Sequence, residues 1–260
     1  MPHETSLGRV LLVGAGPGPA DLLTVRALRA IETAGALLYD ALISDEVIAL
    51  APRACVRIRT GKRAGAASMP QETINRLMLR LARRGLTVVR LKGGDPAIFG
   101  RVGEEKAYLA DHGVETEIIP GITAASAAAA QFGFPLTHRG KARRLLISTA
   151  TVGKGDLLKD GWEAATDPDT TLALYMGRDQ IAAVAGRLIA LGRRPDTPAI
   201  AVENAAHPQA RAITAHLDSL SDAVKAAAPA GPVVILIGEV ASQADAAIDL
   251  APLLARRVAS

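Results

Sequence analysis

The chain has 260 residues, of which 49% are apolar and 22% are charged. This composition supports a sizeable core in one large or two modest domains, and it argues against a disordered chain. The formal net charge of +4 is compatible with an acidic ligand, whereas an aromatic content of 3% argues against a base-stacking surface for single-stranded nucleic acid. We therefore expect a globular protein that acts on a small molecule and does not bind nucleic acid.

The cysteine and histidine content limits which disulfides and metal sites the chain can form. Cys55 is the only cysteine, so neither an intrachain disulfide nor a cysteine-based metal site can form, and the five histidines lack zinc-site spacing. We expect no metal. The polar segment 1–9 lacks the layout of a signal peptide, and no apolar run approaches the length of a membrane span. These features predict a cytoplasmic protein without a membrane segment.

The first 134 residues alternate strand and helix signals. Helical spacing of apolar residues predicts helices over 20–34, 70–84, 103–112 and 122–131. Short apolar or alternating runs predict strands over 9–13, 36–39, 56–59, 87–91 and 114–119. Such repetition predicts an N-terminal α/β domain, residues 1–134, with a mostly parallel sheet covered by helices on both faces.

The pattern breaks near Pro135 and Gly140, where we place the domain boundary. Strands are predicted over 145–149, 171–176, 199–203, 210–215 and 233–238. The third and fourth of these are joined by a short segment and predict a hairpin, so the C-terminal α/β domain, residues 135–260, should contain a mixed sheet. The tail from Ala241 reads as a helix or a partly ordered end.

The most informative stretch is residues 88–105, VVRLKGGDPAIFGRVGEE. A buried strand signal runs into two adjacent glycines and a proline, which let a ligand approach the main chain closely. Four charged residues then cluster near the carboxyl end of the strand, where open α/β sheets bind ligands. They are Asp95, Arg101, Glu104 and Glu105. The stretch therefore predicts a ligand site.

An earlier glycine loop, residues 14–19, suggests a dinucleotide site but departs from its pattern. Pro19 stands where the third glycine should be, Pro17 fixes the backbone in mid-loop, and Asp40 is only a weak match for the expected acidic residue. The lysine and hydroxyl residue of a P-loop are absent too. The sequence thus disfavours a nicotinamide dehydrogenase and a nucleoside triphosphate site.

Taken in order, nine segments resemble the tetrapyrrole methylase family over about residues 8–240. Each segment alone is a weak signal, but the ordered set is specific. The segments are VGAGPGPADLLTVRALRAI, YDALIS, GKRAG, VVRLKGGDPAIFGRVGEE, PGITAASAAAA, PLTHRG, YMG, VEN and IGEV.

This resemblance implies two α/β domains with the active-site cleft between them, in a homodimer. It implies S-adenosyl-L-methionine as methyl donor, with S-adenosyl-L-homocysteine as its product. The reaction implied is methylation of uroporphyrinogen III at ring carbons 2 and 7, through precorrin-1 to precorrin-2, which feeds sirohaem, cobalamin or haem d1 synthesis.

The family pattern also assigns the donor site. Glycine-rich backbone would hold the polar ends of the donor, and apolar side chains would pack its adenine. The donor-site residues implied are Pro17, Gly93, Gly94, Asp95, Ile98, Thr123, Ala124, Met176 and Ala205.

On the acceptor side, uroporphyrinogen III carries eight carboxylates, which arginine forks suit geometrically. The matching motifs point to Arg101, Arg139 and His138 as substrate contacts, with Arg63 a weaker candidate.

For proton transfer the family assigns an acceptor at Asp40 and a donor at Lys62. Arg101 and Glu104 are rival participants, and the residues do not decide between the two pairs.

Three other functions remain open. They are a methylase for a later corrinoid precursor, an RNA-modifying relative disfavoured by the lack of a basic, aromatic-interleaved patch, and a non-catalytic ligand-binding relative.

Overall fold

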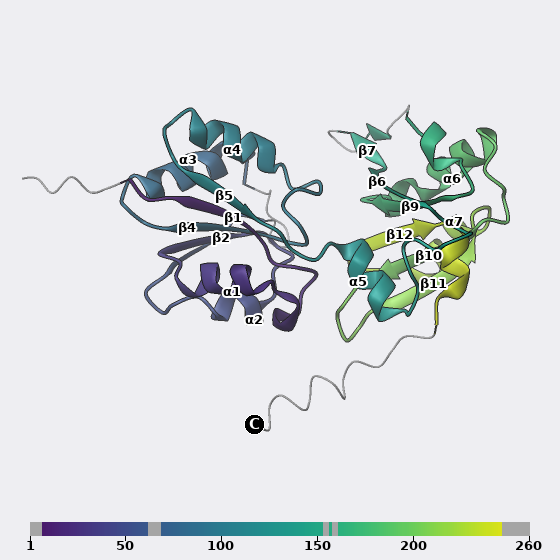
Figure 1. Cartoon of the computed structure of the whole chain (residues 1–260), viewed down its shortest axis with the longest axis horizontal. Helices are drawn as coiled ribbons and strands as arrows, with labels where there is room; N and C mark the ends of the chain where they lie inside the picture. Colours follow the sequence, from purple (N-terminus) through teal and green to yellow (C-terminus); the bar gives the residue numbers. More distant parts are fainter. Residues whose placement is uncertain (1–6, 62–68, 153–155, 158–160, 246–260) are drawn as a thin grey trace, which may run out of the picture. The chain divides into compact units, whose positions relative to one another are not determined.

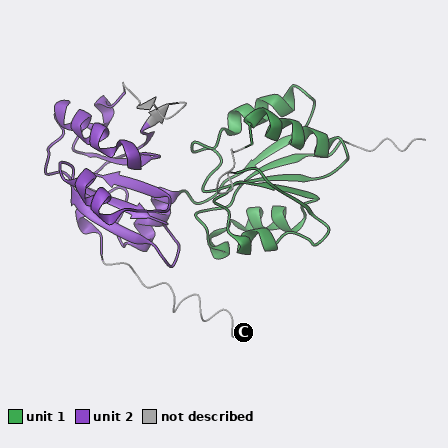
Figure 2. Cartoon of the chain, turned by 180° about the vertical axis from the view of Figure 1, so that it is seen from behind, with its two compact units in different colours: residues 1–123 green, residues 124–260 purple. Residues whose placement is uncertain are grey.

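The computed structural model describes residues 7–61, 69–152, 156–157 and 161–245. The chain divides into two compact units, Met1–Thr123 (unit 1) and Ala124–Ser260 (unit 2), which Figure 2 colours separately. The sequence placed the boundary near residue 135, after helix α5 (Ala124–Gln131). In the structure α5 instead packs against strand β12 (Val233–Ile237) of unit 2, so the division precedes this helix.

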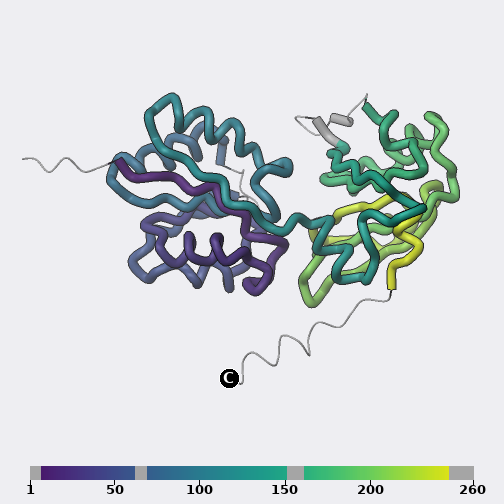
Figure 3. Tube along the Cα trace, viewed as in Figure 1, coloured from purple at the N-terminus to yellow at the C-terminus, as the bar shows by residue number. Residues whose placement is uncertain are grey.

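Unit 1 is built on a five-stranded sheet in the order β3-β2-β4-β1-β5, and every neighbouring pair is parallel. Strands β1 and β5, far apart in the sequence, run side by side (Figure 3). The predicted parallel sheet and its five strands are confirmed. The strands are β1 (Val10–Gly14), β2 (Ala36–Tyr39), β3 (Val56–Arg59), β4 (Val88–Lys92) and β5 (Thr116–Ile119).

Helices cover both faces of this sheet (Figure 1). Alternate strand residues face opposite ways, so Leu11 and Val13 pack with α1 and α2, whereas Val10 and Leu12 pack with α3 and α4. The helices are α1 (Val25–Glu32), α2 (Asp45–Ala49), α3 (Gln71–Ala82) and α4 (Val102–Ala110).

The helix predicted over 20–34 is interrupted. A 3-10 turn, η1 (Ala20–Leu22), comes first, and α1 begins only after Thr24, whose hydroxyl accepts a hydrogen bond from Ala27 N at 3.1 Å. Helix α2 was not predicted from the sequence. It is short and begins just after Ser44, whose hydroxyl accepts a hydrogen bond from Val47 N.

Unit 2 holds a second five-stranded sheet, in the order β11-β10-β12-β9-β6. Only β6 and β9 pair in parallel, and the other neighbours are antiparallel, which confirms the mixed sheet and the predicted hairpin of β10 and β11. A two-stranded ribbon joins β7 (Thr151–Val152) to β8 (Asp156–Leu157). The remaining strands are β6 (Arg144–Thr149), β9 (Thr170–Tyr175), β10 (Pro198–Glu203) and β11 (Arg211–His216).

Helices α6 (Ile181–Ala190) and α7 (Leu220–Ala227) share one core with this sheet, around the buried Trp162. Neither helix was predicted from the sequence. Beyond Asp245 the tail that the sequence read as a helix or a partly ordered end lies outside the described residues. Three short 3-10 turns complete the description of this unit. They are η2 (Glu163–Ala165), η3 (Arg178–Gln180) and η4 (Glu239–Gln243).

Candidate functional site

The strands of unit 1 all end at one edge of the sheet, because they are parallel. We call the loops that leave it, residues 15–19, 40–44, 93–101 and 120–123, the carboxyl edge of unit 1. This is where the sequence places most of its candidate residues, and it is the edge at which open α/β sheets bind ligands.

Two glycines join the first and third of these loops. Gly94 N donates to Gly16 O at 2.7 Å, and Gly16 N donates to Gly94 O at 3.2 Å. Both residues have positive φ, 67° for Gly16 and 69° for Gly94, a region that favours glycine. The loop bearing Pro17 and the loop bearing the predicted donor contacts are therefore held as one piece.

The backbone packing at this edge leaves no room for side chains. A Cβ at Gly121 would lie 2.2 Å from Gly94 O, and one at Gly14 would lie 2.6 Å from Gly121 N. The main chains of these three loops therefore pack directly against one another, and only glycine fits at Gly14 and Gly121.

Asp40, the predicted proton acceptor, is half-buried at the end of β2. Its Oδ1 accepts from Leu42 N at 3.0 Å and its Oδ2 accepts from Gly93 N at 3.2 Å. The carboxylate therefore fixes the first glycine of the 93–95 turn. Lys62, the predicted proton donor, and Arg63 lie outside the described residues.

Asp95 ties the same turn to the loop after β5. Its Oδ1 accepts from Ala97 N at 2.7 Å and its Oδ2 accepts from Gly121 N at 3.1 Å. Half-buried Ile98 closes the turn by donating from its backbone N to Asp95 O at 3.1 Å. Both carboxylate oxygens of Asp95 are thus engaged by main chain, and Thr123, also half-buried, follows on the neighbouring loop.

Arg101 and Glu104 form a two-bond pair at the start of α4. Arg101 Nε donates to Glu104 Oε1 at 2.8 Å and Nη2 donates to Oε2 at 2.7 Å, and both side chains are about half exposed. The hydrogen bond from Arg101 holds the pKa of Glu104 below its usual range, and the bond to Glu104 raises the pKa of Arg101. Glu104 is therefore ionised at neutral pH, and the pair uses two of the five N–H donors of the guanidinium.

Exposed apolar side chains lie at the same edge. Leu42 is 60% exposed and Phe99 is 43% exposed, with φ of 53°. A Cβ on Gly93 would lie 3.4 Å from Leu42 Cβ, which places this side chain beside the glycine turn. Leu42 and Phe99 were not singled out from the sequence, although both lie within matching segments, because an isolated Leu or Phe is usually a core residue.

In unit 2 the candidate Met176 follows β9 in a left-handed conformation, φ 53°, with 57% of its surface exposed. Its neighbour Tyr175 accepts a hydrogen bond at its hydroxyl from Ala125 N at 3.0 Å. This bond joins the end of β9 to the start of α5, where the candidate Ala124 lies.

The candidate Ala205 is buried in a loop after β10, between two residues with positive φ, Asn204 and Ala206. Gln131, a buried residue of α5, holds this loop. Its Oε1 accepts from Ala206 N at 2.6 Å, and its Nε2 donates to His207 O at 3.1 Å. Helix α5 therefore contacts the segments that carry the candidate residues Met176 and Ala205.

His138 and Arg139, the other predicted substrate contacts, occupy an exposed turn in unit 2. His138 N donates to Ala142 O at 2.8 Å, and His138 Nδ1 lies 2.8 Å from Arg139 O. Among the described residues, the Arg139 guanidinium makes no ion pair, so it is available to an anion.

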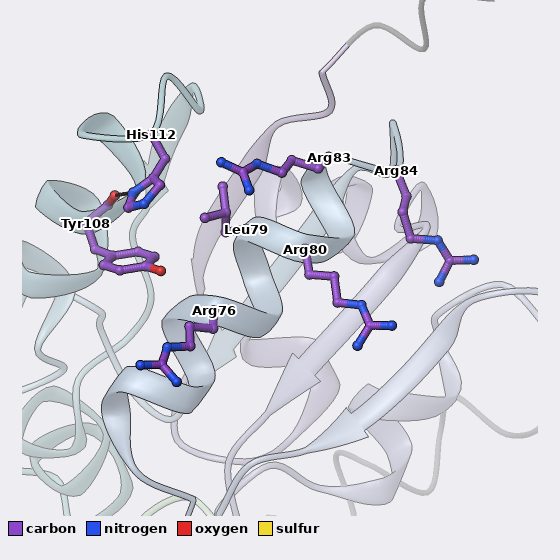
Figure 4. Close-up of a pocket in the computed structure, with 7 residues that line it drawn as sticks. All are labelled: Arg76, Leu79, Arg80, Arg83, Arg84, Tyr108 and His112. Atoms are coloured by element: carbon purple, nitrogen blue, oxygen red, sulfur yellow. Dashed lines mark hydrogen bonds between the residues drawn. The ribbon is translucent and has the colours of Figure 1, made fainter. Parts of the chain in front are cut away.

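A surface hollow of about 570 Å³ lies away from this edge, between α3 and α4 (Figure 4). It borders the end of α3, where Gly8 N donates to Ala82 O just before β1 begins, so it belongs to the opposite edge of the sheet. The helix dipole stabilises Arg80 and Arg83 at the end of α3, and Arg76 pairs with Glu72 on the same helix, so these arginines are accounted for without a ligand. The hollow is lined by Arg76, Leu79, Arg80, Arg83, Arg84, Tyr108 and His112.

Within the described ranges, no helix is both long enough and apolar enough to cross a bilayer. The same residues contain no group of three or more His, Cys, Asp or Glu side chains placed to hold a metal ion.

Comparison with known proteins identifies the family. The profile of "Tetrapyrrole (Corrin/Porphyrin) Methylases" matches residues 9–221. Uroporphyrinogen-III C-methyltransferase of Paracoccus denitrificans is 44% identical over 242 residues, which cover 93% of this chain and 84% of that protein. Siroheme synthase of Chromobacterium violaceum is also 44% identical, but the match covers 92% of this chain and only 50% of that relative.

A solved structure agrees with these matches. Uroporphyrin-III C-methyl transferase from Thermus thermophilus, complexed with S-adenyl homocysteine, aligns with a TM-score of 0.78 at 40% identity. The alignment covers 91% of this chain and all of that one. The resemblance found in the sequence is thereby confirmed, and the chain belongs to the tetrapyrrole (corrin/porphyrin) methylase family.

Proposed function

We propose that this chain is an S-adenosyl-L-methionine-dependent methyltransferase that methylates uroporphyrinogen III at ring carbons 2 and 7, giving precorrin-2 through precorrin-1. The observation that carries the proposal is the carboxyl edge of unit 1. There, the glycine loops tied at Gly16 and Gly94 continue along residues 93–101 into the exposed pair of Arg101 and Glu104. Further support comes from relatives and a solved structure that bear this activity in their names.

The residues present fit the donor. Its ammonium, carboxylate and ribose need polar partners at close range, and the half-buried main chain of Gly93–Asp95 is proposed to supply part of them. Its adenine and methylthio carbons need apolar surface, which Ile98 in unit 1 can provide. When bound, the sulfonium supplies an already activated methyl group, so the protein contributes mainly position. The residues proposed to contact the donor are Pro17, Gly93, Gly94, Asp95, Ile98, Thr123, Ala124, Met176 and Ala205.

The acceptor's carboxylates are proposed to pair with Arg101, Arg139 and His138. Arg101 can do so with the three N–H donors that Glu104 leaves unused. The apolar face of the macrocycle has a complement in the exposed Leu42 and Phe99.

Of the two pairs that the sequence left open, we propose Asp40 as proton acceptor and Lys62 as proton donor. Because its pKa is held low by Arg101, Glu104 is a poor proton donor at neutral pH, which favours an electrostatic role for it. Asp40 would act from a carboxylate that also holds Gly93 in place.

Finer features of the proposal rest on the family resemblance. We propose a cytoplasmic homodimer, which light scattering on a sizing column would test, with a monomeric mass as the contrary result. Relatives named siroheme synthase support the sirohaem branch as the destination of the product.

The donor site is tested by calorimetric titration with S-adenosyl-L-homocysteine. We expect saturable heat at one site per chain, and no heat with NAD or ATP, whose fingerprints the 14–19 loop lacks. A flat titration at high ligand concentration would remove the donor site and with it the proposed function.

A further inference from the structure

A buried ionic cluster lies directly behind the carboxyl edge of unit 1. Glu105, in the first turn of α4, has a side chain with no exposed surface. Its Oε1 accepts from Lys92 Nζ at 2.9 Å, from Gln71 Nε2 at 2.9 Å and from Arg90 Nε at 3.3 Å. One carboxylate therefore joins the end of β4, the start of α3 and the start of α4.

The cluster is costly for a purely structural core. Two cations, Arg90 and Lys92, contact one anion in a region shielded from water, and Asp40 and Glu104 act on Lys92 as further negative charges without a hydrogen bond to it. Burial lowers the pKa of Lys92, and the charge of Arg90 lowers it further. Apolar side chains of similar volume usually stabilise such a position at least as well as an ion pair does. A role beyond stability is therefore expected.

Lys92 links this cluster to the glycine loops through its own main chain. It is the last residue of β4, its carbonyl accepts from Ala15 N at 2.8 Å, and Gly93 follows it. Its side chain reaches Glu105, which adjoins Glu104. Through its backbone, Lys92 thus contacts the loop proposed to bind the methyl donor. Through its ammonium group, it contacts the helix that carries the proposed contacts to the methyl acceptor.

The start of α4 depends on this link, because it lacks the usual capping interaction. Arg101 occupies the N-cap position with φ of 56°, and no described side chain caps the helix there. The backbone bond from Glu105 N to Arg101 O is long, at 3.4 Å. The bond from Glu104 N to Arg101 O at 3.2 Å and the Arg101–Glu104 side-chain pair lie within this turn, whereas the Glu105 carboxylate anchors the turn to β4.

We propose that Lys92 and Glu105 are positioning residues whose buried pair fixes the first turn of α4 against the end of β4. The pair thereby holds Arg101 and Glu104 in register with the 93–95 turn, so that acceptor and donor are presented together. This inference rests on the proposed function, since it assumes that the two groups serve one reaction.

Lys92→Met is the primary test, because it removes one of two cations and leaves Arg90 and Glu105 as a balanced pair. We expect a melting temperature close to that of the wild type and a dissociation constant for S-adenosyl-L-homocysteine within about three-fold of it. The kcat/KM for uroporphyrinogen III should fall by at least about ten-fold, since a displaced contact costs rate more than stability.

Two further variants sharpen the test. Glu105→Asp keeps the charge but withdraws the carboxylate from Lys92. It should lower kcat/KM in the same way, without a matching change in melting temperature or donor affinity. Glu72→Gln is the control, because Glu72 forms an exposed pair with Arg76 on α3 of the same unit. This variant should change neither the melting temperature, nor the dissociation constant for S-adenosyl-L-homocysteine, nor the kcat/KM.

The inference is overturned if folded Lys92→Met and Glu105→Asp both keep kcat/KM within about two-fold of the wild type. It is also overturned if kcat/KM falls only in step with donor affinity and melting temperature, because a merely structural role would produce that result. Failure of the wild type to bind S-adenosyl-L-homocysteine would instead refute the proposed function.

Discussion

Arg101 has the most demanding proposed role, because it must hold an acceptor carboxylate while Glu104 already takes two of its donors. The pair is exposed and its partner is one helical turn away, so it contributes little to stability. The pair instead orients the guanidinium. Held at the start of the helix, the planar group presents its remaining N–H donors in a defined direction.

Arg101→Ala should therefore lower formation of the methylated product by about 100-fold and leave the affinity for S-adenosyl-L-homocysteine unchanged. Arg194→Ala is the matched control, because Arg194 makes the same two-bond contact to Asp196 on the surface of unit 2. Wild-type turnover by Arg101→Ala would exclude this residue from the acceptor site.

The lowered pKa of Lys92 predicts how the stability of the fold depends on pH. Its folded pKa is lowered by burial and by Arg90, and raised in part by Glu105 and Asp40, with the net shift downward. The unfolded chain then binds more protons than the folded one between this lowered pKa and about 10.4, so folding stability gains from rising pH in that window.

Urea unfolding at a series of pH values up to about 10 should show this gain in the wild type and not in Lys92→Met. The difference in unfolding free energy between the two proteins should therefore shift in favour of the wild type as pH rises. A difference that stays constant across the window would show that Lys92 titrates normally.

At the scale of elements, α5 holds the candidate residues of unit 2 in place through two contacts. The hydroxyl of Tyr175 binds its first turn, and the amide of Gln131 binds both sides of the loop that carries Ala205. That loop contains two non-glycine residues with positive φ, so its conformation needs such support.

Gln131→Leu should destabilise the protein by about 2 kcal/mol, because Ala206 N and His207 O lose their buried partners. The affinity for S-adenosyl-L-homocysteine should fall with it. Ser126→Ala, at an exposed position of the same helix, is the control and should leave both unchanged. If Gln131→Leu binds S-adenosyl-L-homocysteine as the wild type does, the loop that carries Ala205 is not part of the donor site.

The glycine contacts at the carboxyl edge give a steric prediction. Gly121→Ala would place a methyl group 2.2 Å from Gly94 O, so the loops must separate and donor binding should be lost. Gly186→Ala meets no atom within 4 Å in the middle of α6, and it should stabilise the protein by about 1 kcal/mol without affecting binding. Calorimetry and thermal unfolding of the two variants test this contrast.

For the molecule as a whole, the sequence predicted most strands, because short β-branched runs end abruptly at glycine or proline. Helices α6 and α7 were missed for different reasons: α6 is apolar on nearly every side and contains Gly186, while α7 has only two large apolar side chains, Leu220 and Val224. The position of α5 could not be predicted either, because its packing against β12 depends on residues about a hundred positions later.

The candidate site was predicted where motifs are local and missed where contacts are distant. Gly93, Gly94 and Arg101 lie within one stretch whose chemistry is visible in the sequence. Glu105 was counted there among the charged residues of the predicted ligand site, and only its burial against Lys92 reveals the ionic cluster. Gln131 reads as a helix end, because its partners lie 75 and 76 residues away.

The central claim is methyl transfer to a polycarboxylate macrocycle, and mass analysis of one incubation tests it most directly. Purified protein, uroporphyrinogen III and methyl-labelled S-adenosyl-L-methionine should yield a tetrapyrrole that has gained two labelled methyl groups, with a single gain at early times. An acceptor recovered without label, from protein shown to bind S-adenosyl-L-homocysteine, would contradict the account.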